Sequence, residues 1–307
     1  MTAADPNRPP RASLLERASD WFDYAPPPPT VAAPRHDPLP PAYVPEPIDA
    51  APAGEFVAVP VVRERVSIDR ERLTERGMLV PGAAVTPLAE EFRLVKRQLL
   101  AAAAEVARSD ADKARALLVC SARPGDGKTF CAANLAFSLA AERDVEVLLV
   151  DADVAKPDVP RVLGLEDGPG LLDAIGDPAA DVETLVLDTD VPQLQILRAG
   201  TRGHADTELL ASTRARQVIA GLARANPRRI VLFDSPPALA ASPAGVLAGL
   251  VGQVMMVVRA DRTSEGDLRE AVTQLAACDR VALILNSVSL RPGGNRYGDY
   301  YTYGGEA

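Results

Sequence analysis

The segment of residues 122–129 constrains the fold of this chain more than any other stretch. It reads Ala-Arg-Pro-Gly-Asp-Gly-Lys-Thr, follows an apolar run at residues 117–120 and precedes a helical pattern at residues 130–141. A strand, a glycine-containing turn and a helix in this order form a phosphate-binding loop, because N–H groups of the turn and the helix N-terminus face the phosphates. Ala122 replaces the usual first glycine. The segment predicts a nucleotide site, with an ordinary strand-turn-helix junction as the alternative.

The side chains of this loop have separate expected tasks. Lys128 is expected to reach the outer phosphates, and the hydroxyl of Thr129 to ligate Mg²⁺. The residues expected to contact the nucleotide are Arg123, Pro124, Gly125, Asp126, Gly127, Lys128, Thr129 and Phe130. Such a loop specifies a nucleotide and not a reaction, so the reaction has to be inferred from other residues.

Two predicted strands end in aspartate. One apolar run is followed by Asp151 and Asp153, and another by Asp234. Both strand ends are expected at the carboxyl edge of a parallel sheet, where the phosphate loop also lies. Magnesium bound by Thr129 would be within reach of these acids. The alternative is that the aspartates only cap the helices that follow.

Apolar runs and helical patterns alternate from residue 87 onward. Strand-like runs lie at residues 116–120, 145–150, 230–233, 254–258 and 281–285, and helical stretches at 88–100, 130–141, 208–225, 243–250 and 265–278. Such alternation implies a parallel sheet covered by helices on both faces. We therefore predict an α/β fold with the mostly parallel sheet of a P-loop NTPase.

The two ends of the chain differ from this region. Of the 28 prolines, 13 lie in residues 1–50, so residues 1–80 are expected to form a disordered Pro- and Ala-rich arm with a short helical motif at residues 13–22. The folded domain is expected over residues 87–290, and a flexible tail over residues 291–307. The tail contains Tyr297, Tyr300, Tyr301 and Tyr303.

Charge and cysteine content narrow the functional classes. The net charge of −9 argues against a nucleic-acid partner, because neutralising a phosphate backbone requires clustered Lys and Arg. Cys120, Cys131 and Cys278 lack metal-ligand spacing, and no N-terminal segment resembles a signal peptide. Pro and Gly interrupt the uncharged stretch 238–258, which argues against a membrane span. We expect a cytoplasmic protein that another polypeptide recruits to the membrane.

Three short motifs together resemble a known family. They are Gly-Asp-Gly-Lys-Thr at residues 125–129, Val-Asp-Ala-Asp-Val-Ala-Lys-Pro at 150–157 and Phe-Asp-Ser-Pro-Pro at 233–237. They are similar to the Walker A, Walker A′ and Walker B motifs of the bacterial tyrosine kinases, or BY-kinases, of capsule and exopolysaccharide systems. The resemblance covers about residues 87–307. Within this family, the chain looks most like the tyrosine autokinases found beside exosortase-type exopolysaccharide loci.

The resemblance implies an ATP- and Mg²⁺-dependent protein-tyrosine autokinase that regulates exopolysaccharide production. The residues implied in catalysis are Lys128, Asp151, Asp153 and Asp234. The residues implied in holding the metal are Thr129, Asp151 and Asp234. The implied phosphate acceptors, modified on neighbouring subunits, are Tyr297, Tyr300, Tyr301 and Tyr303.

The resemblance also implies partners, and two of its motifs are altered. Ala155 replaces a usual arginine, with Lys156 as a candidate substitute. Glu90, Arg93 and Lys96 resemble the Glu-x-x-Arg-x-x-Arg motif with which family members close a ring, except in the last place. Their spacing puts all three on one side of a helix, where they are expected to face a partner subunit, with a solvated helix face as the alternative. A membrane-embedded polysaccharide chain-length or activator protein is the second implied partner.

Two other functions share parts of this pattern. A positioning ATPase of the ParA/MinD type has the same loop and acidic strands, but its signature lysine would fall at Arg123 and it needs no tyrosine tail. A nucleotide-binding regulator of polysaccharide export without transferase activity is the third hypothesis, because of Ala155. For the adenine contact the sequence offers only Asn286, for which capping of a strand end is an equal alternative.

Overall fold

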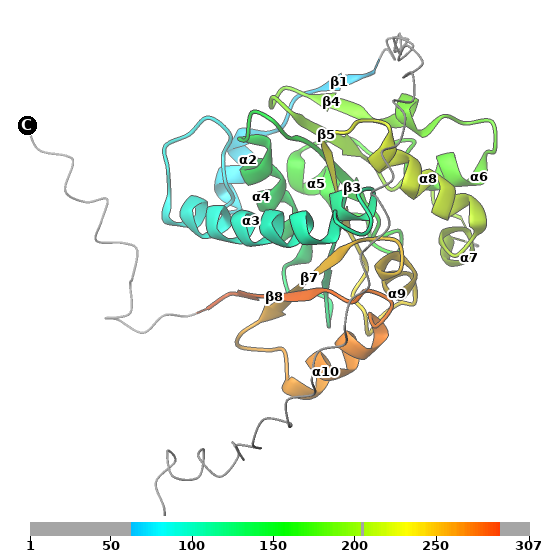
Figure 1. The fold of residues 1–307 in the computed structure, drawn as a ribbon. Coiled ribbons are helices and arrows are strands. Elements are labelled where there is room, and N and C mark those ends of the chain that lie inside the picture. Colours follow the sequence, from blue (N-terminus) through cyan, green and yellow to red (C-terminus); the bar gives the residue numbers. More distant parts are fainter. Residues whose placement is uncertain (1–62, 204–205, 289–307) are drawn as a thin grey trace, which may run out of the picture. The chain divides into compact units, whose positions relative to one another are not determined.

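The described part of the chain builds one β-sheet between two layers of helices (Figure 1). It is seen in a computed structural model that describes residues 63–203 and 206–288. Most of the predicted arm, residues 1–62 with the helical motif, lies outside the described residues. The same holds for residues 289–307 and their four tyrosines.

The sheet has eight strands in the order β1-β4-β5-β3-β6-β2-β7-β8. The strands are β1 Arg65–Val66, β2 Ala116–Ser121, β3 Glu146–Asp151, β4 Leu187–Thr189, β5 Leu194–Leu197, β6 Arg229–Asp234, β7 Gln253–Arg259 and β8 Val281–Asn286. Each neighbouring pair is parallel except β4 and β5, which are antiparallel. The predicted mostly parallel sheet is confirmed.

Helices cover both faces of the sheet, as predicted. One face carries α2 Arg70–Glu75, α3 Pro87–Val106, α4 Lys128–Ala140 and α5 Val159–Leu163. The other carries α6 Leu171–Gly176, α7 Asp206–Leu210, α8 Thr213–Arg224, α9 Pro243–Ala248 and α10 Glu265–Gln274. The 3₁₀ helices η1 Lys113–Arg115 and η2 Val182–Leu185 precede β2 and β4.

Strand β2 shows how the sequence produces this sandwich. Leu118 and Cys120 pack with the α6–α10 layer, whereas Leu117 and Val119 pack with the α2–α5 layer. Successive side chains of a strand point to opposite faces, so a strand covered on both sides has to be apolar throughout. The continuous apolar runs of the sequence reflect this burial.

The helical stretch predicted over residues 208–225 is two helices. Ser212 separates α7 from α8, and its hydroxyl accepts a hydrogen bond from the backbone N–H of Ala215 at 3.1 Å. A serine in this position satisfies an N–H group that has no partner within the helix, so it favours a new helix start. The apolar periodicity continues across the break, so the sequence pattern predicts one helix where the structure has two.

The predicted arm boundary at residue 80 is wrong. Residues 63–80 contain β1 and α2, and the side chain of Leu73 is completely buried against the α2–α5 layer. Asp69 caps α2 by accepting the N–H of Arg72 at 3.0 Å, and the N–H of Asp69 donates to Leu163 O at 3.0 Å. The Pro- and Ala-rich composition that predicts the arm ends before this segment, and Ile68, Leu73 and Met78 are buried in the fold.

Replacing Leu73 by Ala is expected to lower the free energy of unfolding by about 2–5 kcal/mol, the usual cost of truncating a buried leucine. Urea denaturation measures the change. Val85→Ala is the matched control, because Val85 is 53% exposed and its truncation is expected to change stability by less than about 0.5 kcal/mol. Equal stability of the two variants would show that α2 adds nothing to the fold.

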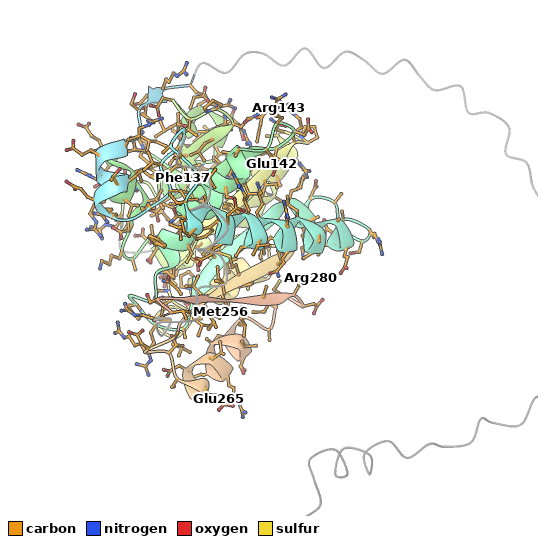
Figure 2. All side chains as sticks on the ribbon, turned by 90° about the vertical axis from the view of Figure 1, so that its left-hand side faces the viewer. Phe137, Glu142, Arg143, Met256, Glu265 and Arg280 are labelled. Atoms are coloured by element: carbon orange, nitrogen blue, oxygen red, sulfur yellow. The ribbon has the colours of Figure 1, made fainter. Side chains whose placement is uncertain are left out.

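The predicted outward direction of Lys96 is also wrong. Lys96 is 6% exposed, its ammonium donates to Ser138 O at 3.0 Å, and it forms an ion pair with Glu142 at 2.5 Å. Glu142 lies beside α3 just after the end of α4 (Figure 2). Glu90 and Arg93 form an ion pair with each other on α3. A lysine can bury its aliphatic stem while its charge finds partners on a neighbouring helix, so Lys96 joins α3 to α4 in this chain.

Within residues 63–203 and 206–288, none of the helices combines the length and the apolar character needed to cross a membrane.

Candidate active site

The phosphate loop connects β2 to α4 at the carboxyl edge of the sheet. Gly125 and Gly127 have φ angles of +84° and +98°, in the left-handed region where a side chain causes strain. Gly127 directly precedes the first residue of α4, Lys128, so the N-terminus of the helix opens toward the loop. A Cβ atom on Gly127 would lie 2.1 Å from Nδ2 of Asn286.

Replacing Gly127 by Ala is therefore expected to weaken nucleotide binding by about tenfold or more. The substitution would strain the loop by roughly 1–3 kcal/mol and displace the N–H groups that contact the phosphates. Calorimetric titration with ATP measures the affinity. Gly221→Ala is the matched control, because Gly221 lies in α8 and an added Cβ atom there would meet open space. Unchanged affinity of the Gly127 variant would contradict this account of the loop.

Two residues on the last two strands hold the loop in place by hydrogen bonds to its backbone carbonyls. Asn286, the last residue of β8, donates from Nδ2 to Asp126 O at 2.8 Å, and Arg259, the last residue of β7, donates to Gly125 O at 3.2 Å. The buried carboxylate of Asp126 accepts the N–H of Arg123 at 2.9 Å, so this predicted nucleotide contact supports the loop from within. The proposed adenine contact of Asn286 stays a prediction, whereas its contact with the loop is observed.

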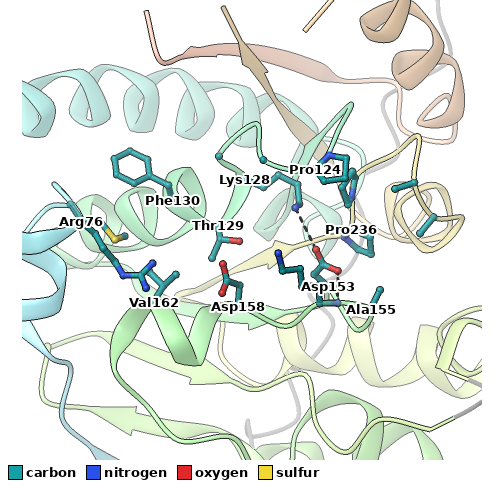
Figure 3. A pocket seen from close by; sticks show the side chains of 17 residues that line it. Arg76, Pro124, Lys128, Thr129, Phe130, Asp153, Ala155, Asp158, Val162 and Pro236 are labelled. Atoms are coloured by element: carbon teal, nitrogen blue, oxygen red, sulfur yellow. Dashed lines mark hydrogen bonds and ion pairs between the residues drawn. The ribbon is translucent and has the colours of Figure 1, made fainter. Parts of the chain in front are cut away.

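The functional side chains of the loop meet the acidic strand ends. The ammonium of Lys128 lies 3.4 Å from Oδ2 of Asp153 (Figure 3). The hydroxyl of Thr129 donates to Oδ2 of Asp234 at 2.6 Å. Lys128 and Asp153 are nearly buried, and Asp234 is completely buried. The sequence anticipated this convergence, because the loop and the acids follow parallel strands of one sheet.

Burial perturbs the acids at this edge. It raises the pKa of Asp234 to about 7, although the charge of Lys128 and the hydrogen bond from Thr129 act in the opposite direction. Burial, and then the charge of Asp234, raises the pKa of Asp151 well above its usual value. Asp151 and Asp234 are register partners on the adjacent strands β3 and β6, so both are difficult to ionise without a compensating positive charge.

These residues fit a divalent cation. Oδ1 of Asp234 is buried and accepts no hydrogen bond from the described residues, and the Thr129 oxygen lies beside the same carboxylate. Hard oxygen donors are the ligands that Mg²⁺ prefers, and Mg²⁺ usually combines one or two of them with nucleotide phosphates and water. No group of three His, Cys, Asp or Glu side chains suited to a metal occurs in the described ranges. Magnesium at Asp234 would therefore need ligands from the nucleotide as well.

Asp151 serves a different purpose from Asp234 in this structure. Its carboxylate accepts three backbone N–H groups, from Asp153 at 3.2 Å, Asp158 at 3.0 Å and Val159 at 2.9 Å. These bonds fix the turn between β3 and α5 and so position Asp153. The predicted roles of Asp151 in catalysis and metal binding stay predictions.

A cavity of about 520 Å³ opens between the loop and this turn. Arg76, Phe130 and Val162 lie toward one end of it, and Pro124, Ala155 and Pro236 toward the other, with Lys128, Thr129 and Asp153 between them (Figure 3). Further lining residues are Met78, Gly125, Gly127, Lys156, Asp158, Pro237, Ala240 and Ala241. Sequence reasoning missed Arg76, Met78, Asp158 and Val162. Arg76 and Met78 fall in the segment assigned to the arm, and no local motif marks any of the four.

Arg123, a predicted nucleotide contact, is directed away from this cavity. Its guanidinium makes two hydrogen bonds of 2.8 Å to the carboxylate of Asp267 on α10. The hydrogen bond from Arg123 is the main cause that lowers the pKa of Asp267 to about 2. In this structure the position that carries the signature lysine of a positioning ATPase is thus engaged within its own chain.

Comparisons with known proteins find relatives in sequence and in structure. A family model described as ParA, NUBPL iron-transfer P-loop NTPase, matches residues 113–191, which include the phosphate loop and β3. EpsB of Ralstonia nicotianae is 36% identical over 183 residues, 59% of this chain and 24% of EpsB. This chain thus spans about a quarter of the length of that relative.

Two further relatives match over most of their own length. The tyrosine-protein kinase YwqD of Bacillus subtilis is 30% identical over 192 residues, 62% of this chain and 78% of YwqD. The solved structure of the BceF tyrosine kinase domain is 31% identical with a TM-score of 0.54, covering 64% of this chain and 76% of that domain. With the P-loop fold and the converging acidic strands, these similarities show that the chain belongs to the bacterial tyrosine kinase family.

Proposed function

We propose that this chain is a protein-tyrosine kinase that transfers the γ-phosphoryl group of ATP to the tyrosines at residues 297–303 of another copy. The observation that carries the proposal is that Lys128, Thr129 and Asp153 line one cavity, with the buried carboxylate of Asp234 hydrogen-bonded to Thr129. Phosphoryl transfer requires mainly positioning and charge stabilisation, and these side chains supply both. Family membership supports a tyrosine as the acceptor.

The ion pair between Lys128 and Asp153 prepares the site for this reaction. When ATP binds, its phosphates attract the ammonium of Lys128 away from Asp153, and the released carboxylate can accept the proton of the tyrosine hydroxyl. The tyrosine oxygen then bonds to the γ-phosphorus while the bond from that phosphorus to the β–γ bridging oxygen breaks and ADP departs. Lys128 stays on the phosphates, where it balances the negative charge of the transition state.

Thr129 and Asp234 are the residues that would hold Mg²⁺, with Asp151 positioning the turn beside them. The cation would neutralise charge on the outer phosphates of the bound ATP. The buried, unpaired oxygen of Asp234 supports this assignment within the described residues.

We place the reaction between copies and link it to exopolysaccharide production, as the family resemblance implies. A membrane-embedded activator protein is the proposed second partner, and the inner face of the membrane the proposed location. Because Lys96 is engaged with Ser138 and Glu142, a ring contact through α3 would have to use Glu90 and Arg93 without it.

Incubation of the purified chain with ATP and Mg²⁺, followed by mass spectrometry of the C-terminal peptide, tests the proposal. Phosphotyrosine is expected among Tyr297, Tyr300, Tyr301 and Tyr303, and a variant with Phe at all four is the control. ATP hydrolysis without phosphotyrosine would instead favour the positioning ATPase. No nucleotide turnover at all would favour the regulator without transferase activity.

Mixing two variants tests transfer between copies. The variant with four Phe substitutions keeps the site but has no acceptors, and Lys128→Met keeps the acceptors but lacks the phosphate-binding charge. Phosphotyrosine on the Lys128→Met chain is expected in the mixture and not in that chain alone. Its absence from the mixture, with an active wild type, would contradict transfer between copies.

A further inference from the structure

A second cavity, of about 580 Å³, lies next to the nucleotide cavity. Its walls come from the segments that follow β3 and β5, which are neighbouring parallel strands. The strands β2, β6, β3 and β5 are neighbours in this order, and their carboxyl ends carry the phosphate loop, Asp234, Asp153 and the second cavity. The second cavity therefore lies at the same edge of the sheet as the nucleotide site. Lys156 lines both cavities, so the two are adjacent.

Positive charge is concentrated in this second cavity. Lys156, Arg198 and Arg202 line it, opposed by the single acid Asp167. This is unusual in a chain whose net charge is −9. Clustered cations repel one another, so their natural ligand is a group with more than one negative charge.

The three positively charged side chains make few and long hydrogen bonds within their own chain. Arg202 donates to Ala155 O at 3.3 Å, which holds its guanidinium beside Lys156. Arg198 makes hydrogen bonds of 3.3 and 3.4 Å to backbone carbonyls and an ion pair of 3.5 Å with Glu64, all at the long end of the range. The ammonium of Lys156 has no hydrogen bond or ion pair with any residue that the structure describes.

We propose that this cavity binds the phosphate of a phosphotyrosine in the acceptor tail of another copy. The inference rests on the proposed kinase function and specifies how the acceptor is held. A phosphorylated tyrosine carries a charge of about −1.5 to −2 and three acceptor oxygens, which match several Arg and Lys donors, whereas a carboxylate offers one charge.

The spacing of the acceptors suits two neighbouring cavities. The four tyrosines lie within residues 297–303, and three residues of extended chain span roughly 10 Å. One modified tyrosine can then occupy the cationic cavity while another reaches Asp153 in the nucleotide cavity. The first phosphorylation thus provides the contact that retains the tail for the next, which favours multiple modification of one tail.

Peptide binding in the absence of ATP tests this inference separately from catalysis. The probes are two fluorescent peptides with the sequence of residues 295–307, one unmodified and one phosphorylated at Tyr303. Binding is measured as the rise in fluorescence anisotropy of each peptide when the full chain is added. The phosphopeptide is expected to bind about tenfold more tightly or better. This preference should weaken as salt is added, because exposed charges are screened.

Substitutions at Arg202 identify the cavity. Arg202 is exposed and lines the second cavity but not the nucleotide cavity, so Arg202→Ala is expected to remove most of the preference for the phosphopeptide. Arg202→Lys should keep part of it, and Arg269→Ala on α10, which removes an exposed arginine elsewhere, should keep all of it. Equal affinity for the two peptides, or an unchanged preference in Arg202→Ala, would overturn the inference. A chain that binds the phosphopeptide but does not phosphorylate the unmodified one would refute the kinase function alone.

Discussion

Lys128→Met is expected to reduce tyrosine phosphorylation by at least about 10²–10³-fold, the usual effect of removing one group that stabilises transition-state charge. Methionine has nearly the length of lysine and suits the buried position of Lys128, but it cannot balance phosphate charge. The loss should therefore appear as missing phosphotyrosine in a folded protein. Quantitative mass spectrometry of the C-terminal peptide measures it, and thermal unfolding verifies the fold.

Lys113→Met is the control for this substitution. Lys113 lies in η1, and among the described residues its ammonium donates only to Gly249 O, at 3.2 Å and away from the phosphate loop. Its replacement should leave phosphorylation within about twofold of wild type, a change of less than roughly 0.4 kcal/mol. Phosphorylation that survives in Lys128→Met would remove this loop from the reaction.

Replacing Glu183 by Ala is expected to lower the free energy of unfolding by about 3–5 kcal/mol, because it leaves a buried charge without its partner. The carboxylate of Glu183 lies 2.5 and 2.9 Å from the two terminal nitrogens of Arg229, which is 2% exposed, and 2.6 Å from Arg63. This cluster joins η2 to β6 and to the residues before β1. Urea denaturation at pH 7 measures the loss.

The same cluster predicts a pH dependence. Burial alone would raise the pKa of Glu183, but the hydrogen bonds and charges of Arg229 and Arg63 outweigh it, and the pKa is lowered. An acid with a lowered pKa stabilises the fold above its unfolded pKa and loses that contribution as the pH falls through its folded pKa. Wild type should therefore lose stability on acidification below the usual glutamate range, and Glu183→Ala should lose less.

Glu265→Ala supplies the comparison for both measurements. Glu265 begins α10 at the surface (Figure 2). It pairs with Arg269, and both side chains are more than three-quarters exposed. Exposed pairs of this kind contribute about 0.3–0.5 kcal/mol. If Glu183→Ala were no more destabilising than Glu265→Ala, the buried cluster would not be a determinant of stability.

The parts of the site that sequence reasoning predicted are those encoded locally. The phosphate loop is a contiguous segment, and Asp153 and Asp234 each follow a recognisable apolar strand. Parallel strands place their carboxyl ends at one edge, so the meeting of these acids with Lys128 followed from the fold class alone. The order of the strands was not needed for this prediction.

The parts that escaped prediction depend on contacts between distant segments. Lys96 has the spacing of a surface residue on α3, and the positions of Ser138 and Glu142 explain its burial. Arg123 belongs to the loop motif, but Asp267, 144 residues away, determines its direction. Residues 63–80 belong to the fold because Ile68, Leu73 and Met78 pack against distant segments, which their local sequence does not reveal.

The hydrogen bond from Asn286 to the phosphate loop affects how the protein unfolds locally. In the part of the chain that the structure describes, β8 is an edge strand paired only with β7, and its residues Leu283 and Leu285 are more than half exposed. Elements with few buried contacts separate from a fold at lower free energy than its centre. When β8 frays, the hydrogen bond from Asn286 to Asp126 O is lost while β2, β3 and β6 stay intact. The first sub-global unfolding step at this edge thus removes one of the two contacts that hold the phosphate loop, while Arg259 on β7 keeps the other and the strands that carry Asp151 and Asp234 stay paired.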